Sequence, residues 1–276
     1  MKKLKCTIAL CFLICIVEAQ SLKGKSILLF TKNGKGYVHD NIAAANHCFD
    51  SLSSRFAFKL IKSQDAAVFT TDQLNKTDLI VFASTNNDVF DSESQKLAFR
   101  KYVESGGKVL AIHSAIGTER NWTWFKQMLG GTFAWHPHFQ PFDLVKIKPQ
   151  HPSLNHIPAR WTHDDECYFN KELYPGTECL LAVDLKTLHP DSTEMAKYIQ
   201  YKGNYSDIYP ISWIHRFDGG LIYLTTLGHH IKEYQGGIFV DYLVDAMKFL
   251  TGDSVKFDAH KAYAKDINEP VKNLMR

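Results

Sequence analysis

Several common sequence signatures are missing from this chain of 276 residues, and each absence excludes a class of function. The chain has no phosphate-binding loop and no glycine-rich dinucleotide fingerprint, so we expect no nucleotide cofactor. Its 32 Lys and Arg residues and 29 Asp and Glu residues are scattered rather than gathered into blocks. Because there is no basic stripe, nucleic acid is not an expected partner.

Long apolar runs are also missing. The run from Thr7 to Val17 is too short for a comfortable transmembrane helix. Lysines precede this run and the small residue Ala19 follows it, a pattern typical of a signal peptide over residues 1–19. We therefore predict cleavage just after Ala19 and export to the periplasm or the extracellular space, with no stable membrane insertion.

Cysteine is scarce once that segment is removed. Only Cys48, Cys167 and Cys179 remain, and an odd number cannot form a full disulfide framework. Cys48 falls on the apolar face of an expected helix and is predicted to lie in the core. Cys167 and Cys179 can pair in an oxidising compartment, but their spacing does not decide whether they do.

The first half of the chain does contain a regular alternation of strand and helix patterns. Continuous apolar runs over residues 26–30, 79–83 and 109–112 predict strands that are buried on both faces. Helical patterns separate these runs, which indicates an α/β fold with one doubly wound, mostly parallel sheet. Further predicted elements are a strand through Phe56, Phe58 and Leu60, and helices over residues 42–52, 92–105, 122–129 and 236–250.

The second half has a different pattern, with more prolines and shorter strands. Asp218-Gly219-Gly220 reads as the turn of a β-hairpin between the last two strands. We therefore predict antiparallel additions to the parallel sheet, followed by a charged C-terminal extension over residues 253–276. The predicted short strands are 144–147, 179–183, 210–217 and 221–226.

His113 directly follows the central apolar run, where ligands bind in open α/β sheets. His229 has a similar place, because it comes shortly after the run 221–226. The plainer interpretation of His113 is a partly buried histidine whose nitrogens bond to the backbone. Of the adjacent pair, His229 is predicted to point inward and His230 to lie at the surface. The segment around His113 also takes the place of a nucleophile elbow, but it lacks both glycines of Gly-x-Ser-x-Gly. If an elbow forms, His113 and not Ser114 takes the nucleophile's position.

A His-x-His pair lies in the second half, at His136 and His138. Two such side chains point to opposite faces of a strand, so both can bind one ion only if the backbone bends at Pro137. The plainer interpretation is a pair of surface histidines in a loop.

The densest polar cluster runs from His163 to Tyr168. Strand alternation would place Asp164, Glu166 and Tyr168 on one face. A carboxylate in an apolar cleft can act as a general acid or bind a metal. The plainer interpretation is a solvated acidic turn.

We predict that His113, His136, Glu166 and His229 converge on one pocket. Three or four such groups can hold a divalent ion such as zinc with a position open for water. Without a metal, Glu166 is the leading general acid–base group with a histidine as its partner, and His113, Glu166 and His229 are the candidate catalytic residues. The plainer outcome is that only two of the four meet, in a structural hydrogen bond.

Beyond these residues, the chain resembles the ThuA-like family, named for trehalose utilisation, over about Lys25 to Gly252. The family implies a fold of the flavodoxin and class I glutamine amidotransferase type, with a histidine where those enzymes carry the catalytic cysteine. His113 agrees with this, so amidotransferase chemistry is not expected. The resemblance also implies a role in sugar catabolism. The matching motifs are Gly36-Tyr37-Val38-His39-Asp40, Val81-Phe82, Gly106 to Ala115, Trp122-Thr123-Trp124, His136-Pro137, Trp161, Asp165 to Tyr168, Pro210 to Trp213 and Leu227-Gly228-His229.

Two hypotheses of different class follow. The first is an exported enzyme that acts on a small sugar or glycoside by metal-assisted or His/Glu acid–base chemistry, with hydrolysis, elimination and isomerisation all open. Its candidate substrate-binding residues are His39, Ser114, Trp122, Trp124 and Tyr168. The second is a non-catalytic sugar-binding or accessory protein that uses Trp122, Trp124, Trp135 and Tyr168 as stacking surfaces.

Overall fold

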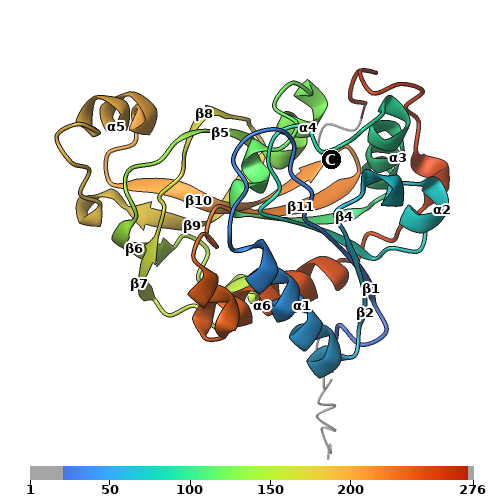
Figure 1. Cartoon of the computed structure of the whole chain (residues 1–276), viewed down its shortest axis with the longest axis horizontal. Coiled ribbons are helices and arrows are strands. Elements are labelled where there is room, and N and C mark those ends of the chain that lie inside the picture. The colour runs from blue at the N-terminus through green and yellow to red at the C-terminus, as the bar shows by residue number, and fades with distance from the viewer. Residues whose placement is uncertain (1–20, 273–276) are drawn as a thin grey trace, which may run out of the picture.

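A nine-stranded mixed sheet forms the centre of the molecule, in the order β2-β1-β3-β4-β11-β10-β9-β6-β7. The computed structural model describes residues 21–272, so the predicted signal peptide lies outside the described residues. The predicted α/β fold with a mostly parallel central sheet is confirmed (Figure 1). The parallel strands are β1 (Ser26–Phe30), β2 (Lys59–Ser63), β3 (Leu79–Ala83), β4 (Lys108–Ile112) and β11 (Gly220–Thr225).

The predicted antiparallel additions extend one side of this sheet. Strand β11 pairs in parallel with β4 and antiparallel with β10, so it joins the two parts. The hairpin turn between β10 and β11 is at Asp218 and Gly219, both with positive φ. A separate two-stranded sheet pairs β5 (Gly131–Trp135) with β8 (Phe169–Leu173). The antiparallel strands of the large sheet are β6 (Gln140–Lys146), β7 (Arg160–Asp165), β9 (Thr177–Asp184) and β10 (Ile208–Phe217).

Two apolar cores lie on the two faces of the sheet, because successive side chains of a strand point to opposite faces. Leu110 and Ile112 of β4 pack into the core beneath α1 (Ile42–Phe56) and α6 (Ile238–Thr251). Val109 and Ala111 pack into the other core, which lies under the helices on the opposite face of the sheet (Figure 1). These helices are α2 (Thr71–Leu74), α3 (Glu93–Glu104) and α4 (Thr123–Leu129).

Short 3₁₀ helices occupy several connections. They are η1 (Ala66–Val68), η2 (His113–Gly117), η3 (Pro152–Leu154), η4 (Leu185–Thr187), η5 (Ile231–Gln235) and η6 (Ala259–Lys261).

The predicted strand through Phe56, Phe58 and Leu60 starts too early. Phe56 is the last residue of α1, and β2 begins only at Lys59, because the helix keeps its apolar face on the core for another turn. Helix α5 (Met195–Lys202) was not predicted; it has no fully buried residue, and it contacts the core only through the partly buried Tyr198 and Tyr201. Strands β5 and β8 were also missed.

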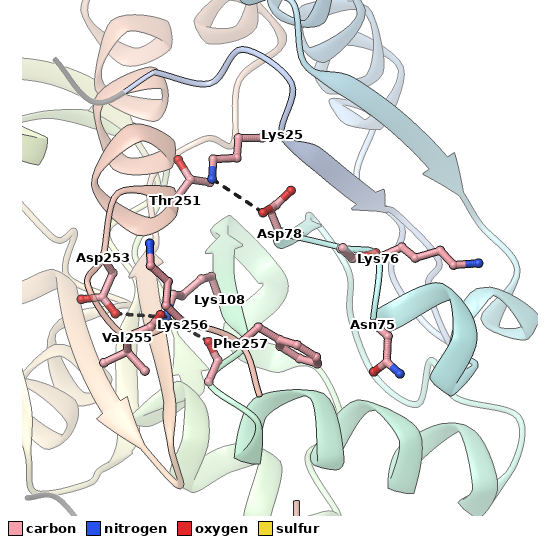
Figure 2. A pocket seen from close by; sticks show the side chains of 13 residues that line it. Lys25, Asn75, Lys76, Asp78, Lys108, Thr251, Asp253, Val255, Lys256 and Phe257 are labelled. Carbon is pink, nitrogen blue, oxygen red and sulfur yellow. Dashed lines mark hydrogen bonds and ion pairs between the residues drawn. The ribbon is translucent and has the colours of Figure 1, made fainter. Parts of the chain in front are cut away.

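The C-terminal extension packs against the amino end of β4 and against α3. Lys108 lies at the start of β4, and its Nζ donates to Asp253 Oδ2 and to the Val255 carbonyl, both at 3.0 Å (Figure 2). Farther along, the Tyr263 amide donates to Glu104 Oε2 at 2.8 Å. This edge of the sheet is thus closed by the chain itself.

Neither a membrane span nor a disulfide occurs within residues 21–272. No helix of this part of the chain is long and apolar enough to cross a membrane. Cys167 and Cys179 are both free, and Cys48 is buried in the core as predicted.

Candidate functional site

The carboxyl edge of the parallel strands gathers four chemically active side chains. His39 lies in the loop after β1, His113 follows β4, Glu166 follows β7 and His229 follows β11. One ligand atom from each of the four lies within 4.8 Å of the others. The structure therefore brings together His113, Glu166 and His229 from the predicted set, and adds His39 to them.

His113 sits at a sharp elbow between β4 and η2. Its φ is +57°, a left-handed conformation that is uncommon for a residue other than glycine. The side chain is fully buried, and Nδ1 lies 2.9 Å from the Thr226 carbonyl. Because a carbonyl can only accept, Nδ1 carries the proton and Nε2 presents its lone pair to the site. Burial, and next the neighbouring His39, hold the pKa of His113 well below its usual value, so the imidazole is neutral.

His39 is held in a similar state. Its Nδ1 lies 3.1 Å from Ser114 Oγ, which leaves Nε2 facing the site. Burial and then the nearby His229 lower the pKa of His39 to about 4. The Tyr168 hydroxyl lies 3.0 Å from His113 Nε2 and 3.4 Å from His39 Nε2. Two neutral imidazoles thus face one point, with a phenol between them.

Glu166 and His229 form the charged half of the site. His229 Nδ1 lies 3.1 Å from Glu166 Oε2 and 3.3 Å from His113 Nε2. Burial alone would lower the pKa of His229, but the hydrogen bond to Glu166 and the charges of Glu166 and Asp165 together outweigh it, so the pKa is raised. For Glu166 burial acts the other way, and the same hydrogen bond leaves its pKa lowered. His136 Nε2 reaches Glu166 Oε1 at 3.6 Å from a more exposed position.

Hydrogen bonds from Asp165 and Asn41 fix the two loops that carry Glu166 and His229. Asp165 accepts from the Glu166 amide at 2.7 Å and from the Gly228 amide at 2.9 Å. Asn41 occupies the N-cap position of α1 but does not cap it. Its amide instead donates to the carbonyls of Gly228, at 2.7 Å, and His229, at 3.0 Å. The sequence analysis gave no sign of this role.

Gly228 is needed for the turn before His229. Its φ is +112°, and a Cβ there would lie 2.8 Å from the Tyr234 hydroxyl. A larger residue would displace the loop that presents His229.

A cavity of about 490 Å³ opens beside the four side chains. Its size is suitable for a small molecule. Asn86, Asn87 and Arg120 line it and were missed by the sequence analysis, although the loop after β3 ends at the same edge of the sheet. The lining residues are Tyr37, His39, Asn86, Asn87, Ser114, Arg120, Phe133, His136, Glu166 and Tyr168.

The predicted role of Trp122 and Trp124 as sugar-stacking residues does not agree with their position. They are 3% and 4% exposed, and both pack in the core on the α3 and α4 side of the sheet. Their indole N–H groups donate to the Ile267 carbonyl and to Asp218. Neither lines the cavity, because the helical pattern that begins at Trp122 turns both rings inward. Trp135 stacks on Phe169 and Tyr201 instead.

Two other sequence expectations are corrected at this edge. His138 does not join His136, because its Nδ1 pairs with Glu194 Oε2 at 2.9 Å. Asp164 does not share a face with Glu166, because β7 ends at Asp165 and the alternation stops there. Asp164 is exposed, whereas Glu166 and Tyr168 turn into the site.

A second histidine–carboxylate cluster lies next to the first and was not predicted. His163 Nε2 lies 3.0 Å from Glu233 Oε1 and 3.5 Å from Asp165 Oδ2. Burial opposes a charge on His163, but the two carboxylates outweigh it and raise its pKa to about 9. Burial and then Asp165 raise the pKa of Glu233 to about 7. This imidazole is a cation held between carboxylates.

The first cluster has the donor set of a zinc-type site. Imidazole nitrogens and one carboxylate oxygen are typical zinc ligands, and catalytic sites keep a position open. The second ring nitrogens of His113 and His39 bond to a carbonyl and to a hydroxyl, the kind of contact that orients metal-binding histidines.

Comparisons with known proteins agree with this fold. The sequence model of the ThuA family, described as trehalose utilisation, matches residues 26–250. A ThuA-like protein from Bacteroides uniformis has a TM-score of 0.65 at 22% identity, with 82% of this chain and 91% of that chain covered. One from Parabacteroides merdae has a TM-score of 0.62 at 19% identity, with 88% and 100% covered. No curated protein matches this chain.

The fold and the edge of the sheet at His113 thus define an α/β protein of the glutamine amidotransferase-like type with histidine at the elbow. Since the family model covers most of the sequence, the chain belongs to the ThuA family. Membership supports a role in carbohydrate utilisation.

Proposed function

We propose that this chain is a carbohydrate-utilisation enzyme whose site binds a divalent ion such as zinc. The observation that carries the proposal is the convergence of ligand atoms from His39, His113, Glu166 and His229 within 4.8 Å. Of the residues first considered as ligands, His136 is replaced in this set by His39. His136 lies at the mouth of the cavity and reaches Glu166 only at 3.6 Å, which suits contact with a substrate better.

The protonation states of the site support metal binding. Neutral imidazole is the ligand form, and His39 and His113 are neutral because burial lowers their pKa values. The proton between His229 and Glu166 is the one that an ion would replace. A bound divalent ion supplies Lewis acidity and lowers the pKa of water.

The residues around the ion-binding groups supply the remaining chemistry. Without a bound ion, Glu166 itself is the general acid–base candidate, since it faces the cavity and pairs with His229 at 3.1 Å. The Tyr168 hydroxyl is a donor toward the same point, and burial keeps it protonated by raising its pKa far above the usual value. Ser114 orients His39. The cavity of about 490 Å³ suits a small sugar or glycoside.

The non-catalytic alternative is weaker because three of its four predicted stacking residues, Trp122, Trp124 and Trp135, do not line the cavity. Trp122 and Trp124 lie in the core, and Tyr168 is mostly buried. An imidazole at position 113 cannot form the thioester of an amidotransferase, so that chemistry is not proposed either.

Elemental analysis and a turnover screen test this function. Purified chain loaded with zinc and dialysed should retain about one ion, the stoichiometry of a single four-ligand site. A screen of oxidised and unoxidised disaccharides should then find turnover that His113→Ala and Glu166→Gln both remove. A chain that holds no ion, and whose turnover is unchanged in both variants, would contradict the proposal.

We also propose that the chain is exported. The support is the N-terminal pattern of lysines, an apolar stretch and Ala19. Protein recovered from its native host should begin near Gln20 or Ser21. Recovery of a mature cytosolic form that retains Met1 would show this part to be wrong.

A further inference from the structure

Arg120 is a half-buried cation that has no carboxylate partner. It lines the same cavity as Glu166 and His136, yet no Asp or Glu within residues 21–272 lies within 4.0 Å of its guanidinium. The other arginine of this part of the chain that is not exposed, Arg100, is differently placed. Arg100 pairs with Glu104 at 2.9 Å and lies 3.7 Å from Asp218. A buried charge is usually paired, so the isolation of Arg120 calls for an explanation.

The carboxylates closest to Arg120 in the sequence and in the cavity are already engaged. Glu119 is fully buried and points away, with one oxygen accepting from the amides of Val89 and Phe90 and the other 2.6 Å from Lys96. Glu166 pairs with histidines. Neither is free to neutralise Arg120.

The guanidinium is held in place but keeps donors free. Nε donates to the Gly117 carbonyl at 2.9 Å, and Nη2 donates to Asn86 Oδ1 at 3.1 Å. A guanidinium has five N–H donors, so three remain. A Cβ on Gly117 would lie 2.7 Å from Nη2 and from Asn86 Oδ1, which means that glycine permits this close arrangement.

Phe133, followed by Tyr168 and His136, connects Arg120 to the histidine cluster. The guanidinium lies over the Phe133 ring, 5.5 Å from the centroid. That ring is 4.4 Å from Tyr168 and 6.0 Å from His136, by centroids. One small ligand in the cavity can therefore contact Arg120 and the cluster together.

We propose that Arg120 is a specificity-determining residue that binds a carboxylate of the substrate, so that the cavity takes an acidic sugar such as a uronate or an aldonate. This inference rests on the proposed function for its carbohydrate part. A planar guanidinium donates two parallel hydrogen bonds to a carboxylate, and one cation balances its single charge. A phosphate carries more charge, and no lysine lines the cavity.

Calorimetry on the zinc-loaded full chain tests the proposal. The probes are glucuronate, galacturonate, gluconate and cellobionate, each paired with its neutral parent sugar, and glucose 6-phosphate. At least one acid should bind about ten- to hundredfold more tightly than its parent, the range for a hydrogen-bonded charge. Arg120→Gln should remove this ratio while it changes binding of the neutral sugar less than about twofold, and Arg120→Lys should restore part of it.

Each other outcome overturns the proposal. It fails if no acid outbinds its parent, if Arg120→Gln keeps the ratio, or if the sugar phosphate binds more tightly than every carboxylate. If Arg120 had only a structural role, both variants would bind acid and neutral sugars more weakly to the same degree and would have a lower unfolding temperature.

Metal content separates this proposal from the proposed metal function. If zinc is not retained but the Arg120-dependent ratio persists, only the proposed metal function is wrong. If zinc is retained but the ratio is absent, only the proposed carboxylate site is wrong.

Discussion

Two histidine–carboxylate clusters are adjacent in the structure, because Asp165 belongs to one and Glu166 to the other. Within each cluster the ligand atoms lie within 4.8 Å of one another. The first has three imidazoles and one carboxylate, and it borders the cavity through His39 and Glu166. The second, made of His163, Asp165 and Glu233, has one imidazole between two carboxylates. Proximity alone therefore does not distinguish them.

The ratio of imidazole to carboxylate decides what each cluster can do. In the first, burial and then a neighbouring imidazole lower the pKa values of His39 and His113, which therefore keep their lone pairs. In the second, the carboxylates raise the pKa of His163 to about 9, so its Nε2 carries a proton and cannot bind an ion. The comparison indicates that the first cluster is a ligand site and the second a structural ion network.

The largest expected effect is the loss of metal binding in His113→Ala. Removal of a central ligand should reduce zinc content from about one ion per chain to none. The free energy of unfolding of the metal-free form should change by only about 1 kcal/mol, mainly from the hydrogen bond to Thr226. Elemental analysis and urea titration measure the two quantities. His230→Ala is the matched control, because this neighbouring histidine only accepts from the Lys232 amide. Full zinc retention by His113→Ala would reverse the assignment of the clusters.

His163→Ala should show the opposite pattern. It leaves Asp165 and Glu233 buried without their cation, which should cost about 3–5 kcal/mol of unfolding free energy while zinc content is kept. His138→Ala is the control, since its pair with Glu194 at 2.9 Å has an imidazole that is 49% exposed and a carboxylate that is 16% exposed. That control should lose less than about 1 kcal/mol. A stable His163→Ala that loses zinc would contradict the structural role.

Acid should destabilise the metal-free protein through the first cluster. The folded pKa of His39 is depressed from 6.5 to about 4, so its contribution is present above pH 6.5 and is lost as pH falls to 4. The difference in unfolding free energy between the wild type and His39→Gln should change by about 3 kcal/mol over this window. His47→Gln, on the exposed side of α1, should leave the acid slope unaltered. Parallel curves for His39→Gln and the wild type would argue against a neutral His39.

Alkali should act through the second cluster with the opposite sign. The folded pKa of His163 is raised from 6.5 to about 9, so its stabilisation is present below pH 6.5 and disappears as pH rises to 9. Thermal or urea unfolding from pH 6.5 to 9 should show a loss of up to about 3 kcal/mol that His163→Gln lacks. Equal losses in both proteins would mean that His163 is not a cation.

Asn41→Ala should give the smallest effect, and only in the first cluster. It frees the carbonyls of Gly228 and His229, so His229 is less well positioned. Loss of such an outer contact typically weakens metal affinity about 10–100-fold. Asn46→Ala provides the control, because its amide only bonds to Ile42 within α1. Competition with a chelator measures the change, and unaltered affinity would rule out the positioning role.

The sequence predicted the parts of the molecule that depend on local pattern. Continuous apolar runs predicted β1, β3 and β4. His113 was singled out because it directly follows the run that forms β4. Helix α5 lacked a clear signal because none of its residues is fully buried. Trp122 and Trp124 were misplaced because aromatic residues suit cores and sugar faces equally well.

Contacts between distant segments were beyond sequence reasoning. Asn41 bonds to residues 187 and 188 positions away. The second cluster depends on Glu233, which is far from β7 in the sequence and meets His163 of that strand only in the folded molecule. No spacing rule encodes such meetings, since they follow from the order of strands in the sheet.

The left-handed backbone at His113 also sets two contributions to stability against each other at one residue. A φ of +57° costs a histidine about 1–2 kcal/mol that glycine would not incur. Glycine would relieve this strain, but it would lose the hydrogen bond to Thr226 and the packing of a fully buried ring. Position 113 is therefore a place where backbone strain and side-chain contacts act on stability in opposite directions.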